Sequence, residues 1–327
     1  MNILLITEQR EGKWNKVSFE TLAAAQQIAG EVKGTLRAVV IGKGVAALAD
    51  ELAAKKLEEV LLVEHALLEH YTADGYAHAL KQVIEQSKPD LVLLPHTYQV
   101  RDFAPKLAAK MNKGLVADCV GYRNDGGKLT FVRQMFQGRT AADVTFQSDA
   151  PWFATFQAGA FRADQVADGA GKAPVKSVSV ELTAAQIRTV PKELFREAKQ
   201  AVDLTQSPII VAIGRGIKEA ANIPLAQKLA DAIGGEMAAS RPICDEGWLP
   251  MERQIGSSGQ TVAPKLYLAL GISGAIQHVV GMKGSRCIVA VNKDANAPIF
   301  EVADYGIVGD IFEIMPALTE ALEKAKA

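Results

Sequence analysis

The amino-acid sequence predicts an α/β protein of two domains, each with a mostly parallel sheet flanked by helices. The chain has 327 residues, and a typical domain has about 150. Its hydrophobic fraction of 49% is that of a globular chain. In both halves, short apolar runs alternate with amphipathic segments, as in βαβ units whose strands are buried on both faces.

The first hundred residues alternate regularly. A strand over Ile3–Ile6 precedes a helix that ends near Val32, and Ser18 is its predicted N-cap, because a serine side chain can accept a hydrogen bond from the first turn. Further elements follow in the same alternation. They are strands over 36–41, 60–63 and 91–94, and helices over 45–56, 73–87 and 99–111.

After Asn112 the pattern changes to strands without intervening helices. The predicted strands cover 128–137, 139–147, 152–157 and 175–182. We expect residues 113–182 to form an antiparallel elaboration of the first sheet. The polar segment 192–207 lacks periodicity, so we place the first domain at residues 1–200 and the second at 201–327.

The second domain repeats the alternation, with strands over 209–213, 237–239, 266–270, 288–291 and 307–308. Helices are expected over 217–233, over 275–280 and at the C-terminus. Each strand ends in a small or polar loop, and open α/β sheets bind ligands at the carboxyl ends of their strands. The residues expected to converge there are Arg215, Ser240, Arg241, Ser273, Asn292 and Asp310.

The strongest phosphate-binding candidate is Gly271-Ile-Ser-Gly274, because glycine allows close backbone approach and a helix N-terminus follows. An ordinary tight turn is the alternative. Gly214-Arg-Gly216 is weaker, because Glu219 stands where a G-x-G-x-x-G motif has its third glycine. Arg241 could bind an anion, stack on a flat ring or stay solvated. Asp310 could accept ribose hydroxyls or cap a helix.

The polar loop Gln254–Gly259 could hydrogen-bond to a ring edge or be a flexible linker. Five histidines without an H-x-x-x-H pair indicate no metal site. A net charge of −1 argues against nucleic-acid binding. No apolar stretch reaches the ~20 residues that cross a bilayer, and no signal peptide is recognisable. We therefore expect a cytoplasmic protein without membrane insertion, whose three separated cysteines stay reduced.

Two segments of the second half closely resemble the signature of the electron transfer flavoprotein α subunit. They are residues 263–278, APKLYLALGISGAIQH, and residues 288–310, IVAVNKDANAPIFEVADYGIVGD. The similarity is nearly gapless from Pro208 to the C-terminus and looser before it, as in Arg101-Asp-Phe-Ala-Pro-Lys. It implies a Rossmann-like (DHS-like) domain that binds one FAD, and a heterodimer with a β subunit that carries AMP or a second FAD.

The resemblance also implies an electron carrier rather than an enzyme with its own acid–base residues. Electrons would come from acyl-CoA dehydrogenases or other dehydrogenases and pass, through a stabilised flavin semiquinone, to a quinone oxidoreductase or another acceptor. The first domain would contact the β subunit. A complex that bifurcates electrons is compatible with the same sequence.

The resemblance places FAD contacts along the carboxyl ends of the strands of the second domain, which we call the rim. Arg215 would contact the diphosphate and Arg241 would lie over the isoalloxazine. The Ser258 hydroxyl would lie near flavin N5, His278 near O2, and Gln277 by the ribityl chain. The full predicted set is Arg215, Ser240, Arg241, Gln254, Ile255, Gly256, Ser257, Ser258, Gly271, Ile272, Ser273, Gly274, Ala275, Ile276, Gln277, His278, and, for the adenosine half, Asn292, Asp310 and Ile311.

Two other functions stay open on the residues alone. One is a nicotinamide-dependent enzyme with a DHS-like domain, which would need an acid–base residue beside the nicotinamide. The other is a nucleotide-binding assembly subunit without redox chemistry. A bound flavin that cycles reversibly would separate the electron carrier from both.

Overall fold

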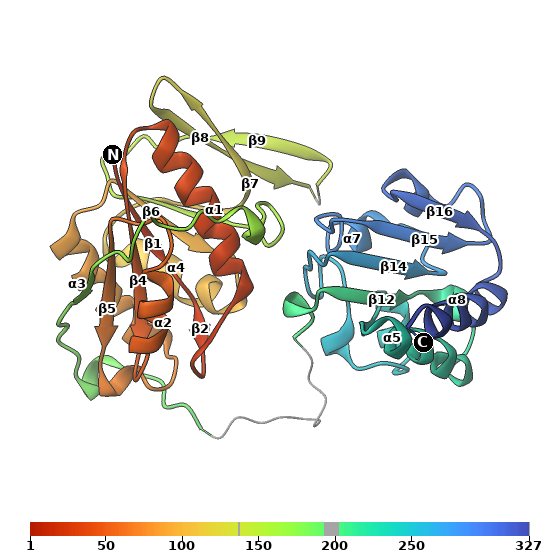
Figure 1. Ribbon diagram of the computed structural model, residues 1–327. Helices are drawn as coiled ribbons and strands as arrows, with labels where there is room; N and C mark the ends of the chain where they lie inside the picture. The colour runs from red at the N-terminus through yellow and green to blue at the C-terminus, as the bar shows by residue number, and fades with distance from the viewer. Residues whose placement is uncertain (137, 193–202, 327) are drawn as a thin grey trace. The chain divides into compact units, whose positions relative to one another are not determined.

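The computed structural model describes residues 1–136, 138–192 and 203–326, which fall into two compact units (Figure 1). The first unit holds strands β1 to β11 and the second holds β12 to β16, and we describe each by itself. The predicted domain boundary after residue 200 lies outside the described residues.

The first unit is built on a nine-stranded sheet in the order β11-β5-β4-β1-β6-β10-β7-β8-β9. From β11 to β7 every neighbouring pair is parallel. The four strands predicted in the first hundred residues are present as β1 (Asn2–Ile6), β4 (Thr35–Gly42), β5 (Glu59–Glu64) and β6 (Leu91–Pro95). A small hairpin of β2 (Gln9–Arg10) and β3 (Lys13–Trp14) follows β1.

Helices cover both faces of this sheet, which explains its continuous apolar strands. Leu5 of β1 packs in one core with α1 (Lys16–Glu31) and α2 (Ala46–Leu52). Its neighbour Leu4 packs in the opposite core with α3 (Ala73–Ser87) and α4 (Tyr98–Lys110). Because successive side chains of a strand point to opposite faces, both positions must be apolar, and the parallel α/β prediction is confirmed.

The prediction for residues 113–182 was wrong in part. Among the described residues of this segment, antiparallel strand pairing is limited to β7 (Leu115–Asp125), β8 (Lys128–Met135) and β9 (Thr140–Val144), apart from one isolated bridge between Asp168 and Lys55. β10 (Trp152–Phe156) lies instead between β6 and β7 and is parallel to both, and the short β11 (Val175–Ser177) is parallel to β5.

β7 was not predicted, because its sequence has neither an apolar run nor a regular alternation. Its register shifts against both neighbours, and Asp118 has a positive φ of 62°. A bulge of this kind interrupts the period of two on which strand recognition depends.

The cap of α1 also differs from prediction. The Asn15 side chain accepts a hydrogen bond from the Val17 amide at 3.0 Å and caps the helix. Ser18 lies inside the helix, where its buried hydroxyl accepts from the Glu8 amide at 2.8 Å.

The second unit has a parallel sheet in the order β13-β12-β14-β15-β16. Numbered along the chain this order is 2-1-3-4-5, a doubly wound arrangement. The strands are β12 (Ile209–Ile213), β13 (Glu236–Ala239), β14 (Leu266–Leu270), β15 (Ile288–Asn292) and β16 (Tyr305–Val308).

Helices α5 (Ile223–Ile233) and α8 (Ile311–Lys326) pack on one face of the second sheet. The other face packs against loop residues such as Ile255 and against Ile299 of a 3₁₀ turn. The short α7 (Ile276–Val279) contacts this face through His278, which pairs with Tyr267 of β14. α5 begins later than predicted because Pro224 fits only the first turn of a helix.

We predict that Asn15→Ala lowers the free energy of unfolding of the first unit by about 1 kcal/mol, because the first turn of α1 loses its cap. Asn15→Ser is the matched control, since serine keeps the capping acceptor but not the amide bond to Glu8. Urea unfolding followed by circular dichroism measures both. Equal losses in the two variants would contradict the capping role.

Candidate functional site

The candidate site lies at the carboxyl ends of β12 and β14. These strands are neighbours. After β12 the chain forms β13 on one side of it, and then crosses over to form β14 on its other side. Such a reversal is where open α/β sheets bind ligands. The two loops that leave these strands, 214–216 and 271–274, carry predicted site residues.

The backbones of the two loops touch. Gly214 N donates to Leu270 O at 2.9 Å, and Gly216 N donates to Gly271 O at 3.1 Å. A Cβ on Gly214 would overlap the Gly271 carbonyl, and a Cβ on Gly216 would lie 2.6 Å from Gly271 Cα. Gly274 has φ +87° and packs against the Ile299 backbone. The glycines are therefore required for loop packing, whether or not a phosphate binds beside them.

The arginines of the rim are exposed. Arg215 begins a 3₁₀ turn, and within the described residues it has no ion pair. Arg241 was expected in a loop but begins the short helix α6 (Arg241–Asp245), directly after Ser240. Its Nε donates to Asp245 Oδ2 at 3.2 Å. With 67% of the Arg241 side chain exposed, this pair is weak and the guanidinium can turn to a ligand.

The loop Gln254–Gly259 is a packed element and not a flexible linker. Ile255 N donates to Ala239 O at the end of β13, at 2.9 Å. Ser257 N donates to Gln277 O at 2.7 Å, which ties the loop to α7. The structure thus brings together two predicted segments, 254–258 and 277–278, that lie about twenty residues apart in the chain.

Two buried polar atoms lie unpaired in these two segments. Gln254 donates through Nε2 to Ser258 Oγ at 2.8 Å, but its Oε1 has no hydrogen-bond partner among the described residues. The same is true of His278 Nδ1, whereas His278 Nε2 lies 2.9 Å from the Tyr267 hydroxyl. Buried polar atoms are nearly always paired, so the two atoms indicate a missing partner with hydrogen-bonding groups of its own.

The far end of the rim holds Asn292 and Asp310. Asn292 Nδ2 donates to Ile272 O at 2.9 Å. Asp310 accepts from the Phe312 amide at 3.0 Å and caps α8, and it pairs with Lys293 at 2.6 Å. These two bonds lower the pKa of Asp310, the one to Lys293 most strongly.

Three predicted residues contribute their side chains to the core rather than to the rim. Ile255, Ile272 and Ile311 are buried among apolar neighbours, so a ligand could meet them only through the backbone. Ser273, Ala275, Ile276 and Gln277 are exposed beside the glycine loops.

Three residues that pair with predicted site residues were not predicted: Tyr267, Asp245 and Lys293. The only signal for Tyr267 is one hydroxyl in an otherwise apolar strand. Asp245 was missed because α6 was not predicted, although its spacing of four residues from Arg241 is that of a helical pair.

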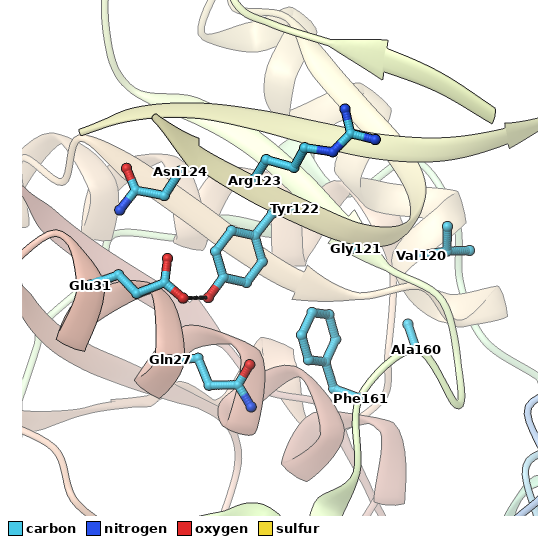
Figure 2. A pocket seen from close by; sticks show the side chains of 9 residues that line it. All are labelled: Gln27, Glu31, Val120, Gly121, Tyr122, Arg123, Asn124, Ala160 and Phe161. Atoms are coloured by element: carbon cyan, nitrogen blue, oxygen red, sulfur yellow. Dashed lines mark hydrogen bonds between the residues drawn. The ribbon is translucent and has the colours of Figure 1, made fainter. Parts of the chain in front are cut away.

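The first unit has a separate pocket of about 370 Å³ between α1 and β7. Figure 2 shows the Tyr122 hydroxyl directed at Glu31, to which it donates a hydrogen bond of 2.7 Å. The Tyr122 ring stacks on Phe161. This pocket contains none of the predicted site residues.

The described residues contain no group of three metal-ligating side chains. In the same part of the chain, every helix is too short or too polar to cross a bilayer.

We predict that Gly274→Ala destabilises the second unit more than Gly247→Ala. Both glycines have positive φ, which costs alanine about 1–2 kcal/mol. Only Gly274 faces backbone atoms that cannot move aside, and overpacking adds about 1–3 kcal/mol. Denaturant unfolding of the two variants measures the difference in the free energy of unfolding. Equal decreases in the two variants would show that the backbones of Gly274 and Ile299 can move apart.

The pH dependence of stability should carry a His278 component. Burial lowers the pKa of His278 to about 4, partly offset by the Ile255 backbone. The unfolded chain therefore binds a proton between pH 6.5 and 4 that the folded chain excludes. The free energy of unfolding should fall by about 3 kcal/mol as the pH drops through this window. His278→Asn should lack this component, and identical pH profiles would refute it.

Comparisons with known proteins place the chain in a family. Residues 3–183 match the electron transfer flavoprotein domain, and residues 203–283 match the electron transfer flavoprotein FAD-binding domain. The electron transfer flavoprotein subunit alpha of Bacillus subtilis is 40% identical, over 98% of this chain and 97% of that protein. The protein of the same name from Thermoanaerobacterium thermosaccharolyticum is 38% identical, over 99% and 98%.

A differently named relative is 36% identical over 99% of this chain and 96% of its own. It is the acryloyl-CoA reductase electron transfer subunit beta of Anaerotignum propionicum. The matches favour neither a nicotinamide-dependent enzyme nor a subunit without redox chemistry. The chain has an FAD-binding domain and belongs to the electron transfer flavoprotein α-subunit family.

Proposed function

We propose that this chain is the α subunit of a heterodimeric electron carrier, which takes electrons from a dehydrogenase and passes them to a quinone oxidoreductase or another acceptor. The observation that carries the proposal is the pair of unpaired buried atoms, Gln254 Oε1 and His278 Nδ1, beside the glycine loops. One is an acceptor and the other belongs to an imidazole that can donate.

These residues fit FAD. An isoalloxazine ring offers carbonyl acceptors and an N–H donor at one edge, which matches an amide oxygen and an imidazole N–H. The diphosphate would lie by the glycine loops with Arg215, and the adenosine would lie toward Asn292 and Asp310. Bound FAD supplies one-electron redox chemistry, and the chain itself binds and orients the cofactor.

Two side chains would set the electrostatics at the flavin end. Arg241 contributes a permanent positive charge, and its exposed pair with Asp245 leaves it free to reorient. His278 would act as a neutral hydrogen-bond donor, because burial keeps it uncharged near pH 7. Both favour negative charge on the ring and so favour its reduced state.

The proposed partners follow from the first unit and from the relatives. β9 forms the open edge of the nine-stranded sheet, and its residues are exposed or half-buried. Open edges are normally covered, so we assign this antiparallel extension to contact with a β subunit that carries AMP or a second FAD. The acryloyl-CoA reductase relative supports a redox partner that acts on CoA esters.

The test is anaerobic stepwise reduction of the chain co-expressed with its β subunit, followed by absorbance. We expect a bound flavin that accepts electrons one at a time. Arg241→Ala should lower the potential of the first electron by about 60 mV or more, equivalent to about tenfold in the equilibrium constant.

Arg286→Ala is the control. Arg286 lies just before β15, at the amino end of that strand, whereas the candidate site lies at the carboxyl ends of the strands. A colourless complex that stays colourless with added FAD would refute the proposal. An unchanged potential in Arg241→Ala would remove the role of that arginine alone.

A further inference from the structure

Tyr267 is a fully buried tyrosine in the second strand position of β14. Its hydroxyl lies 2.9 Å from His278 Nε2, and its ring meets the imidazole edge-on at 6.1 Å. Within the described residues, that hydroxyl has no other hydrogen-bond partner. The contact therefore has to satisfy the phenolic proton.

This requirement fixes the direction of the hydrogen bond. A neutral imidazole has one donor nitrogen and one acceptor nitrogen. If Nε2 carried the proton and donated it, the phenolic O–H would be buried without an acceptor, which is costly. If the phenol donates, Nε2 accepts, and the proton of the imidazole stands on Nδ1.

We propose that Tyr267 is a positioning residue that holds His278 in the tautomer with its proton on Nδ1. The site then offers a bound ligand a neutral, buried N–H donor at an atom that the protein itself leaves unpaired. The ligand group that this donor selects is a hydrogen-bond acceptor such as a ring carbonyl. This inference rests on the proposed function for the identity of that ligand as the flavin ring.

The surroundings hold both side chains in place. β14 is paired on both sides, with β12 and β15, and the Tyr267 amide donates to Cys287 O at 2.8 Å. The His278 amide donates to Ala275 O at 2.8 Å. No charged group contributes to the pKa of His278, which is lowered by burial and raised only by the Ile255 backbone. The ring is therefore neutral near pH 7, and the Tyr267 phenol is its hydrogen-bond partner at Nε2.

The first measurement is the ¹⁵N chemical shifts of the His278 imidazole in the complex with the β subunit, with and without its flavin. We expect a protonated Nδ1 and an unprotonated Nε2 in both states near pH 7. Protonation at Nε2 in the flavin-free protein would overturn the proposal without any variant. A complex that binds no flavin would refute the proposed function, yet the flavin-free spectrum would still decide the tautomer.

The second measurement uses Tyr267→Phe, which keeps the buried ring and removes the phenolic proton. We expect the tautomer ratio to shift at least tenfold toward Nε2–H and the first flavin potential to fall. Tyr305→Phe, the same change at an exposed tyrosine of β16, should alter neither.

In a His278→Asn background, Tyr267→Phe should leave the potential unchanged, because the tautomer that it controls is gone. A change of the same size in that background would mean that Tyr267 acts through packing, and would overturn the proposal. Unchanged ¹⁵N shifts in the single variant would do the same.

Discussion

The site in the second unit depends on one constraint, the contact between the backbones that leave β12 and β14. Gly214 and Gly216 donate to the carbonyls of Leu270 and Gly271, and a side chain in place of any of the three glycines Gly214, Gly216 and Gly271 would separate the loops. Because the two loops meet there, the centre of the rim consists of glycine backbone, and the polar side chains lie around it. The proposed ligand residues Arg241, His278 and Asp310 lie on the helices α6, α7 and at the start of α8, around this contact.

The first unit has the same kind of strand reversal, between β1 and β6, but fills it with its own side chains. Glu8 follows β1 and is buried. Its carboxylate accepts hydrogen bonds from Arg10 at 3.1 Å, from Asn15 at 3.0 Å and from the Thr97 hydroxyl after β6. A buried carboxylate with three donors holds the loops together without glycine. The two units thus treat the same kind of strand reversal differently: buried side chains bridge it in the first unit, and a contact of glycine backbones bridges it in the second.

Much of this could be predicted because burial on both faces leaves a continuous apolar signal. The strand Ile209–Ile213 and the helix Ala73–Ser87 have the predicted bounds. Where the signal is irregular, as in the bulged β7, prediction failed. The rim residues could be named from the strand ends, whereas the pairing of His278 with Tyr267 could not. That pairing depends on how α7 returns over the sheet, which no local pattern encodes.

The position of β10 has a consequence for biosynthesis. Residues 152–156 enter the middle of the first sheet, between two strands that precede them in the chain, and β11 then completes the opposite edge. During translation, β6 and β7 therefore cannot reach their final spacing until β10 has been synthesised and has inserted between them. The nascent first unit stays open until about half of the chain has been synthesised, whereas strands of the second unit pair close to their order of synthesis.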